Sequence, residues 1–125
     1  MNNIKDIENI FLKIDIEGSE YDFINQINAF SKIINGFVIE FHSCDKKIKL
    51  LENIIFKLSN FYLSHIHANS YSTIGKNDVP DLLELTFVNK KFVKKIKRNN
   101  LKSYPIKNLD NPNHNRHNEI KINFK

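Results

Sequence analysis

Apolar residues alternate with charged ones through most of residues 11–17, and this pattern predicts a β-strand. The period then lengthens, because the apolar residues between 19 and 33 follow the spacing of a helix. Gly18 permits the tight turn between the two elements, and Ser19 is a suitable N-cap for the helix. The pattern therefore predicts a strand that passes directly into a helix.

A second strand and helix follow in the same order. Residues 37–42 are apolar almost to their end and predict a strand, while residues 44–59 carry the apolar stripe of an amphipathic helix. Gly36 is a natural residue to end the first helix, and Ser43 is a natural cap for the second. Strand, helix and strand with short connections form a βαβ unit, so we expect the two strands to be parallel neighbours.

The pattern changes in the second half of the chain. Residues 61–68 predict a third strand, residues 69–78 a polar loop, and residues 81–88 a fourth strand. Because no helix separates the third and fourth strands, we expect them to pair antiparallel.

The carboxyl-terminal part is less regular. Residues 90–98 predict a basic helix or extended arm, and residues 119–124 alternate as an edge strand does. We expect residues 1–125 to form a single domain, with its core at about residues 10–90 and a basic arm and carboxyl-terminal extension over residues 91–125.

Composition narrows the class of protein. Hydrophobic residues make up 41% of the chain, as is typical of a globular domain. The net charge of +5 comes largely from residues 90–98, which we interpret as a solvated face. Stacking aromatic residues are not interleaved there, so we expect no nucleic-acid partner.

The single cysteine, Cys44, excludes a disulfide framework and suits a reducing compartment. With no apolar run of about 20 residues and no signal-peptide pattern, we expect a cytoplasmic protein without a membrane partner.

Polar residues interrupt the apolar pattern at three strand ends. In each case they stand two positions apart, and so share one face of the strand. Buried parallel strands are normally apolar throughout, and ligands of open α/β sheets bind at the carboxyl ends of the strands. We therefore predict a polar cleft at this end of the sheet. The three pairs are Asp15 and Glu17, Glu40 and His42, and His65 and His67.

Such a cleft is compatible with more than one chemistry. A carboxylate or a histidine could take the proton of an acceptor hydroxyl as a general base. Carboxylates with imidazole could instead hold a divalent cation that orients the hydroxyl, although the spacing is not that of a zinc motif and we assign no metal ligand. Structural roles are also open: Glu17 could neutralise Lys13, Glu40 and His42 could pair with each other, and His65 is interpreted as structural.

The run from Lys13 to Glu20, Lys-Ile-Asp-Ile-Glu-Gly-Ser-Glu, resembles the signature of the FkbM-type methyltransferases, which use S-adenosylmethionine. In that family such a run closes the fourth strand of a Rossmann-like sheet. The strand at residues 61–68, the loop at residues 69–71 and the strand after Pro80 also look like the carboxyl-terminal part of these proteins. The resemblance covers residues 10–90.

The resemblance implies an α/β fold, namely a partial Rossmann-like class I methyltransferase sheet of parallel strands followed by an antiparallel hairpin, which we expect in three layers. It implies the carboxyl-terminal half of an enzyme that transfers a methyl group from S-adenosylmethionine to a hydroxyl of a small molecule, sugar or glycan. Together with the polar strand ends, it makes five residues the catalytic candidates, the first two of which would also touch the cofactor. They are Asp15, Glu17, Glu40, His42 and His67.

The cofactor half of such an enzyme is missing from the pattern. The chain has three glycines, none of them in a Gly-x-Gly loop, and nothing before Phe11 supplies a cofactor-binding strand. We therefore expect a fragment, a misassigned start, a split gene or a decayed copy that binds S-adenosylmethionine weakly or not at all. The alternative is a non-catalytic fragment that recognises an acceptor or pairs with a partner, which would be a second copy of the chain or a complementary amino-terminal half.

Overall fold

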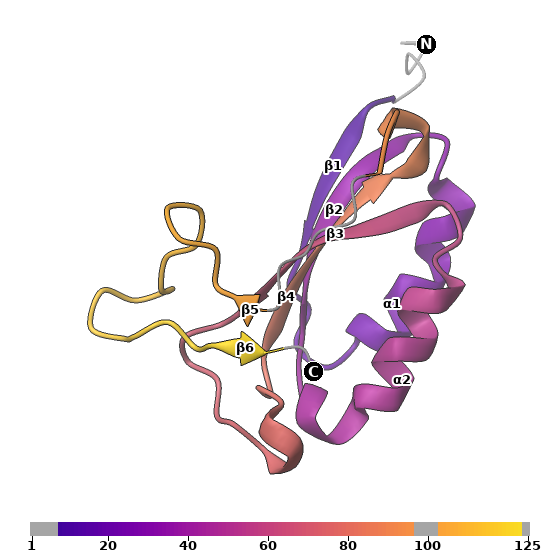
Figure 1. The fold of residues 1–125 in the computed structure, drawn as a ribbon. Helices are drawn as coiled ribbons and strands as arrows, with labels where there is room; N and C mark the ends of the chain where they lie inside the picture. The colour runs from indigo at the N-terminus through magenta and orange to yellow at the C-terminus, as the bar shows by residue number, and fades with distance from the viewer. Residues whose placement is uncertain (1–7, 97–102, 124–125) are drawn as a thin grey trace, which may run out of the picture.

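The computed structural model describes residues 8–96 and 103–123, and a four-stranded sheet forms its centre (Figure 1). The order across the sheet is β1-β2-β4-β3. The strands are β1 (Ile10–Ile14), β2 (Ile34–Phe41), β3 (Phe61–Ala68) and β4 (Leu83–Asn89). All four strands lie within the predicted core.

The strands of this sheet do not all run in one direction. β1 and β2 pair parallel, whereas β4 pairs antiparallel with both β2 and β3. The expected parallel pair and the expected antiparallel pair are both confirmed. The pattern did not indicate that β4 would lie between β2 and β3, so that β1, β2 and β3 share a direction and β4 alone is reversed. The fold is a mixed α/β arrangement in which most strand pairs are antiparallel.

Two helices, α1 (Glu20–Ile27) and α2 (Cys44–Lys57), lie on the same face of the sheet (Figure 1). The expectation of three layers is therefore wrong. Successive right-handed crossovers that advance across a sheet in one direction place their helices on one side. Residues 109–113 lie over the opposite face, beside Val38 and Glu84, whereas Lys121–Asn123 line a cavity together with α2. The described residues 103–123 contain no helix.

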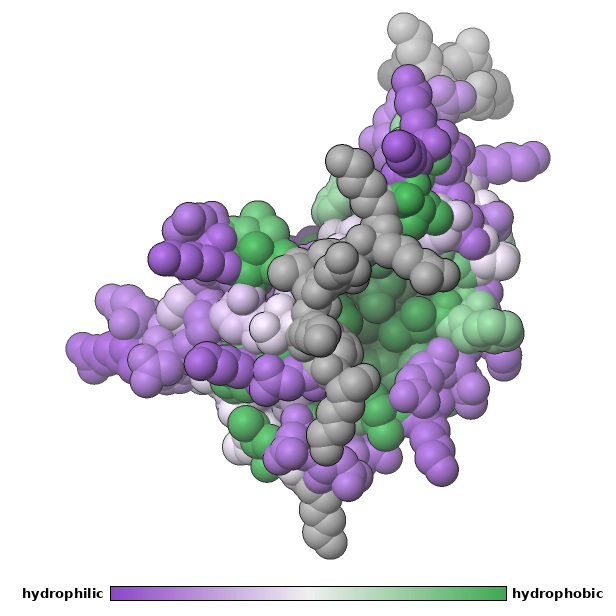
Figure 2. Space-filling model, viewed as in Figure 1, coloured by the Kyte–Doolittle hydropathy of each residue, from purple (hydrophilic) through white to green (hydrophobic). Residues whose placement is uncertain are grey.

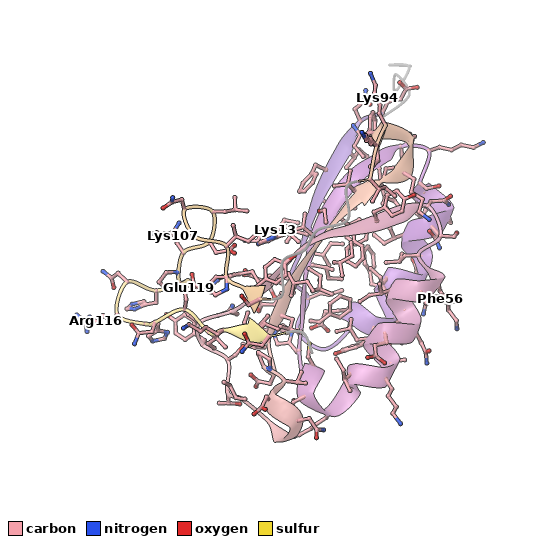
Figure 3. All side chains as sticks on the ribbon, in the orientation of Figure 1. Lys13, Phe56, Lys94, Lys107, Arg116 and Glu119 are labelled. Carbon is pink, nitrogen blue, oxygen red and sulfur yellow. The ribbon has the colours of Figure 1, made fainter. Side chains whose placement is uncertain are left out.

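The core lies between the helices and the sheet. Phe37 of β2 is fully buried; its ring stacks on Phe87 of β4 at 4.8 Å and meets the edge of Phe61 at 5.2 Å. Side chains fill this space in Figure 3, whereas Phe56 lies on the outer side of α2 and is 90% exposed. Burial of such aromatic rings is the main favourable contribution to folding.

Three turn residues behave differently from their predicted roles. Ser19 and Ser43 do precede helices, but neither side chain makes a capping hydrogen bond. Gly36 does not end a helix but lies inside β2, where a Cβ atom would stand 2.7 Å from the carbonyl oxygen of Phe87. The first helix ends earlier than expected because the chain tightens into a 3-10 turn at Asn28–Phe30.

The carboxyl-terminal segment forms a separate ribbon. Within the predicted basic helix or extended arm, Lys90–Phe92 forms a 3-10 turn and residues 93–96 are not helical; Lys97 and Arg98 lie outside the described residues. The predicted edge strand is reduced to β6 (Ile122–Asn123), which pairs with β5 (Ser103–Tyr104) and not with the main sheet. Phe124 lies outside the described residues. Among the helices of the described part, none is long and apolar enough to span a membrane.

Candidate functional site

The ends of β1 and β2 bring together three of the predicted site residues. Asp15 directly follows β1, Glu40 lies near the end of β2, and His42 follows it. One ligand atom from each of these side chains lies within 4.8 Å of the others. Because the two strands are parallel neighbours, their carboxyl ends meet at one edge, as the sequence pattern indicated.

Glu40 is held in place by two neighbours. One carboxylate oxygen, Oε1, lies 3.5 Å from Nε2 of His42. The other, Oε2, accepts a hydrogen bond of 2.8 Å from the side-chain amide of Asn69, which is itself buried. The backbone N–H of Tyr71 donates to the amide oxygen of Asn69 at 3.0 Å, and so fixes the orientation of that amide. Glu40 is therefore preorganised with Oε1 toward His42.

Glu20 is a functional candidate that the sequence reasoning missed. It is the first residue of α1 and is fully buried. Its Oε1 accepts hydrogen bonds from the backbone N–H of His42, at 3.1 Å, and from Nδ1 of the His42 ring. Its Oε2 is also buried and makes no hydrogen bond with a described residue. A signal was present, because Glu20 stands four and seven residues before Ile24 and Ile27, on the buried face of the helix.

The carboxylate of Glu20 is ionised despite its position. Burial raises the pKa of such a group, but nearby backbone N–H groups and His42 offset this effect, and the pKa of Glu20 is lowered. An ionised carboxylate only accepts hydrogen bonds, so Nδ1 of His42 carries the hydrogen between them. In the neutral ring, Nε2 is then the free nitrogen, and it faces Glu40.

Tyr21 and Cys44 support this site without offering a reactive group. The Tyr21 hydroxyl donates to the backbone carbonyl of His42 at 2.8 Å, which fixes the chain after β2. Burial raises the pKa of the Cys44 thiol to about 11 and also raises the pKa of Tyr21. Both groups are therefore protonated at neutral pH, and Cys44 is not an activated nucleophile.

The turns after β1 and β2 both contain left-handed backbone. Gly18 has a φ of 98°, as its predicted turn requires, and the preceding Glu17 has a φ of 32°. Ser43, next to His42, has a φ of 57°. Residues other than glycine seldom adopt this region, and such strain is concentrated at functional sites. Glu17 itself is exposed in its turn and does not belong to the cluster of Asp15, Glu40 and His42.

His67 lies on the same face of the sheet, but both of its nitrogens are already bonded. Nδ1 lies 2.6 Å from Glu84 and Nε2 lies 3.1 Å from Glu119. The hydrogen bond with Glu84, assisted by Glu119, raises the pKa of His67 to about 9 against the effect of burial. His67 is thus an imidazolium that links β3, β4 and the carboxyl-terminal segment, a geometry that favours a structural role. His65 makes a similar link, to Asp110 at 2.7 Å.

A polar cavity of about 230 Å³ opens beside Glu40. A second cavity, of about 260 Å³, shares Glu84 and Asn113 with it and extends toward His65 and His67. Carboxylates, amides and a lysine are suitable hydrogen-bond partners for hydroxyl groups. The polar lining of the first cavity consists of Lys13, Asp15, Glu40, Asn69, Glu84 and Asn113.

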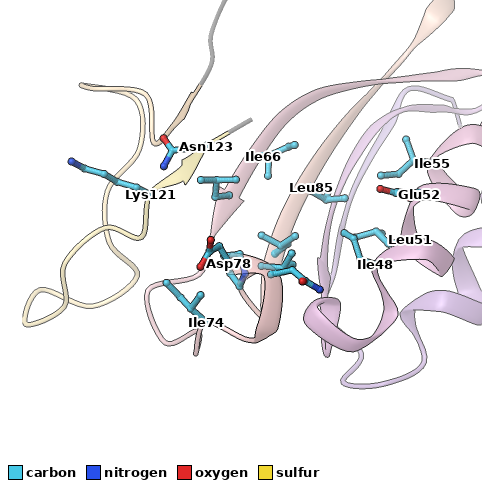
Figure 4. Close-up of a pocket in the computed structure, with 15 residues that line it drawn as sticks. Ile48, Leu51, Glu52, Ile55, Ile66, Ile74, Asp78, Leu85, Lys121 and Asn123 are labelled. Atoms are coloured by element: carbon cyan, nitrogen blue, oxygen red, sulfur yellow. The ribbon is translucent and has the colours of Figure 1, made fainter. Parts of the chain in front are cut away.

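A larger apolar cavity, of about 680 Å³, lies between α2 and the carboxyl-terminal segment. In the space-filling view, apolar side chains gather in a hollow over this part of the molecule (Figure 2). Figure 4 shows Ile48, Leu51 and Ile55 of α2 on one side and Lys121 on the other. The apolar cavity shares no lining residue with the polar cavity beside Glu40, and no cluster of reactive groups lines it.

Comparisons with models of known protein families, with curated proteins and with solved structures give no match to this chain. The function is therefore argued from the geometry of the site and from the resemblance of the Lys13–Glu20 run.

Proposed function

We propose that this chain is the carboxyl-terminal half of a Rossmann-like, S-adenosylmethionine-dependent O-methyltransferase of FkbM type. In this proposal, its polar cavity receives the acceptor hydroxyl. The observation that carries the proposal is the cluster of Asp15, Glu40 and His42 at the carboxyl ends of two parallel strands. Asp15 comes from the signature-like run, whereas Glu40 and His42 come from the next strand. Two independent parts of the sequence thus contribute to one site.

The arrangement of the sheet also supports the proposal. The resemblance implies two parallel strands with a reversed strand beside them. β1 and β2 are parallel, and the reversed β4 lies directly beside β2. From the single cysteine, we further propose that the protein works in the cytoplasm.

His42 is the side chain best placed to act as general base. Its Nδ1 hydrogen is donated to Glu20, and its Nε2 is directed toward Glu40, which borders the polar cavity. A histidine that is oriented by a carboxylate can accept a proton at its other nitrogen. In this role, Nε2 would accept the proton of the acceptor hydroxyl; the methyl group would have to be supplied by S-adenosylmethionine. His67 is not proposed as a base, because both of its nitrogens are bonded.

The fit of the cofactor itself is poor. S-adenosylmethionine supplies an electrophilic methyl group when it is bound, but Asp15 and Glu17 are the two residues we propose to touch it. The chain has no Gly-x-Gly loop that would let the backbone approach a cofactor closely. We therefore assign acceptor recognition to this chain and expect weak cofactor binding or none.

Two titrations of the full chain test the proposal. Calorimetry with S-adenosylmethionine should give no micromolar binding, and such binding by a monomer would show that the cofactor site is misplaced. Saturation-transfer NMR with monosaccharides such as glucose and fucose should give signals that Glu40→Gln removes. Asp22→Asn, on the exposed surface of α1 and away from both polar cavities, is the control. No saccharide signal, or a signal that Glu40→Gln leaves unchanged, would contradict acceptor binding at this site.

A second candidate function is pairing with another chain. β1 is an edge strand of the described sheet, and apolar residues are exposed around it: Phe11 is 60% and Phe30 is 54% exposed. An apolar cavity of about 190 Å³ lies between β1 and α1. An open strand edge with exposed apolar neighbours favours pairing with a further strand. In that case the chain would be a non-catalytic fragment that a partner completes.

A further inference from the structure

The cluster at the ends of β1 and β2 offers the kinds of atom that divalent cations bind. Asp15 and Glu40 each provide a carboxylate oxygen, His42 provides a ring nitrogen, and these atoms lie within 4.8 Å of one another. Two ligands on opposite sides of a cation, at bond lengths of about 2.0–2.6 Å, are separated by roughly 4–5 Å. The three side chains therefore lie within the largest separation that two ligands of one cation can have.

Two of these three side chains are oriented by neighbouring residues. Asn69 donates to Oε2 of Glu40 at 2.8 Å and leaves Oε1 facing His42. Glu20 accepts the hydrogen on Nδ1 of His42 and leaves Nε2 facing Glu40. In protein metal sites, a histidine ligand donates its other N–H to a carboxylate or carbonyl in the same way, and ligating carboxylates are also hydrogen-bonded.

The geometry also favours a positive charge at this place. Nε2 of His42 faces Oε1 of Glu40 at 3.5 Å, and without a hydrogen or a cation between them these two hydrogen-bond acceptors repel each other. Glu20 is an independent second observation, because it is fully buried and its Oε2 has no partner among the described residues. A buried polar oxygen without a hydrogen-bond partner is costly. A cation bound at Nε2 would separate the two facing acceptors and place a positive charge near Glu20.

We propose that Asp15, Glu40 and His42 bind one divalent cation, with Glu20 and Asn69 as the residues that position its ligands. Carboxylate and imidazole donors without a thiolate suit Mn²⁺ or a similar ion. Asp15 is exposed, so the cation would face the polar cavity and could orient an acceptor hydroxyl there. The cation and the general-base role of His42 are alternatives, because the single lone pair of Nε2 cannot bind a cation and accept a proton at the same time. The test of the cation site uses neither a methyl donor nor an acceptor.

The experiment is a titration of the full chain with Mn²⁺. The free ion is followed by electron paramagnetic resonance, and the bound ion by paramagnetic broadening in ¹H–¹⁵N spectra. We expect one bound ion per chain, with the strongest broadening at the ring of His42 and the amides around Asp15 and Glu40. Asp15→Asn and Glu40→Gln should each weaken the affinity at least about 10-fold. Asp15 is exposed, so its variant keeps the fold and stays informative even if the Glu40 variant unfolds.

The control variant is Glu52→Gln, which removes an exposed carboxylate of α2 and should leave the affinity unchanged. Three results would overturn the proposal. One is the absence of a bound ion in a large excess of Mn²⁺. Another is equal affinity in Asp15→Asn and the unmodified chain. The third is broadening centred on His114 and His117, whose rings lie 5.0 Å apart in the carboxyl-terminal segment.

Discussion

The buried carboxylate of Glu20 accepts a hydrogen bond from the ring nitrogen Nδ1 of His42, 22 residues further along the chain. The same oxygen also accepts the backbone N–H of His42 at 3.1 Å. This pair of bonds joins the start of α1 to the end of β2, and so fixes both the ring and the backbone of His42. The helix that follows β1 therefore controls the geometry of a residue on the next strand.

Glu20→Gln should destabilise the protein and release the ring of His42. The charge-assisted bond is lost and a buried amide is left partly unpaired, so we expect a loss of about 1–3 kcal/mol in the free energy of unfolding. Urea denaturation followed by circular dichroism measures this loss, with the exposed Asp22→Asn of the same helix as the control. Long-range ¹H–¹⁵N spectra should show hydrogen on Nδ1 of His42 in the unmodified chain and a mixture of tautomers in the variant. An unchanged tautomer with unchanged stability would contradict the assigned role.

Stability should fall at alkaline pH because of His67. Its pKa is raised from 6.5 to about 9 in the folded state, chiefly by the hydrogen bond with Glu84. Because the pKa is higher in the folded state, protonated His67 stabilises the fold. This contribution is complete below pH 6.5, the pKa in the unfolded chain, and is lost as the pH rises through 9. We expect a loss of about 1–3 kcal/mol over this range.

Denaturant titrations at a series of pH values between 6 and 8.5 would measure the slope that His67 produces, below the range in which the raised pKa of Cys44 adds a slope of the same sign. His67→Gln should remove most of the slope, whereas a substitution of the exposed Lys46 should not. A slope that persists in His67→Gln would assign the effect to another group. At acid pH the sign reverses, because the pKa values of Glu20 and Glu84 are lowered and their stabilisation is lost as both become protonated.

Gly36→Ala should destabilise the sheet by steric conflict. The new Cβ would stand 2.7 Å from the carbonyl oxygen of Phe87 and 3.0 Å from the ring of Phe11. The first atom belongs to the backbone of β4 and cannot move without disturbing the β2–β4 pairing, so we expect a cost of about 1–3 kcal/mol. Gly18→Ala is the informative comparison, because nothing lies within 4 Å of its Cβ position and only the left-handed φ of 98° opposes it. Thermal unfolding of both variants measures the difference, and an unchanged midpoint for Gly36→Ala would be inconsistent with the close approach.

The exposed apolar surface beside β1 should cause self-association. We expect sedimentation velocity to show a concentration-dependent dimer, because the open edge of β1 and the neighbouring Phe11 and Phe30 are accessible to a second chain. Phe30→Lys should weaken this association at least several-fold. Phe56→Lys is the matched control, since Phe56 is 90% exposed but lies on the outer side of α2 (Figure 3). A monomer at all concentrations, or an equal effect of both variants, would argue against pairing at β1.

The elements of the core could be predicted because their patterns are local. The strand predicted at residues 61–68 has the same bounds as β3. The short connections between strand, helix and strand predicted the parallel pairing of β1 and β2. The position of β4 between β2 and β3 could not be predicted from these patterns, because it depends on contacts between residues far apart in the chain. Gly36 was misread for the same reason, since its role depends on the distant Phe87.

The site was only partly predictable. Polar residues placed two positions apart at the strand ends identified Asp15, Glu40 and His42, which the fold brings together. Glu20 entered the sequence reasoning as the last residue of the signature-like run, although its spacing from Ile24 already placed it on the buried face. The bonds of His67 to the carboxyl-terminal segment had no local signal, because its partner Glu119 is 52 residues away.

The central position of β4 has a consequence for synthesis of the chain on the ribosome. In the described sheet, β3 pairs only with β4, so residues 61–68 have no neighbouring strand until residues 83–89 have emerged. Until then, a nascent chain exposes an edge of β2 and both edges of β3, together with the apolar side chains that β4 will cover. The main sheet is therefore completed only after β4 has emerged, and a chain that ends before Leu83 would contain β3 but could form only the parallel pair of β1 and β2.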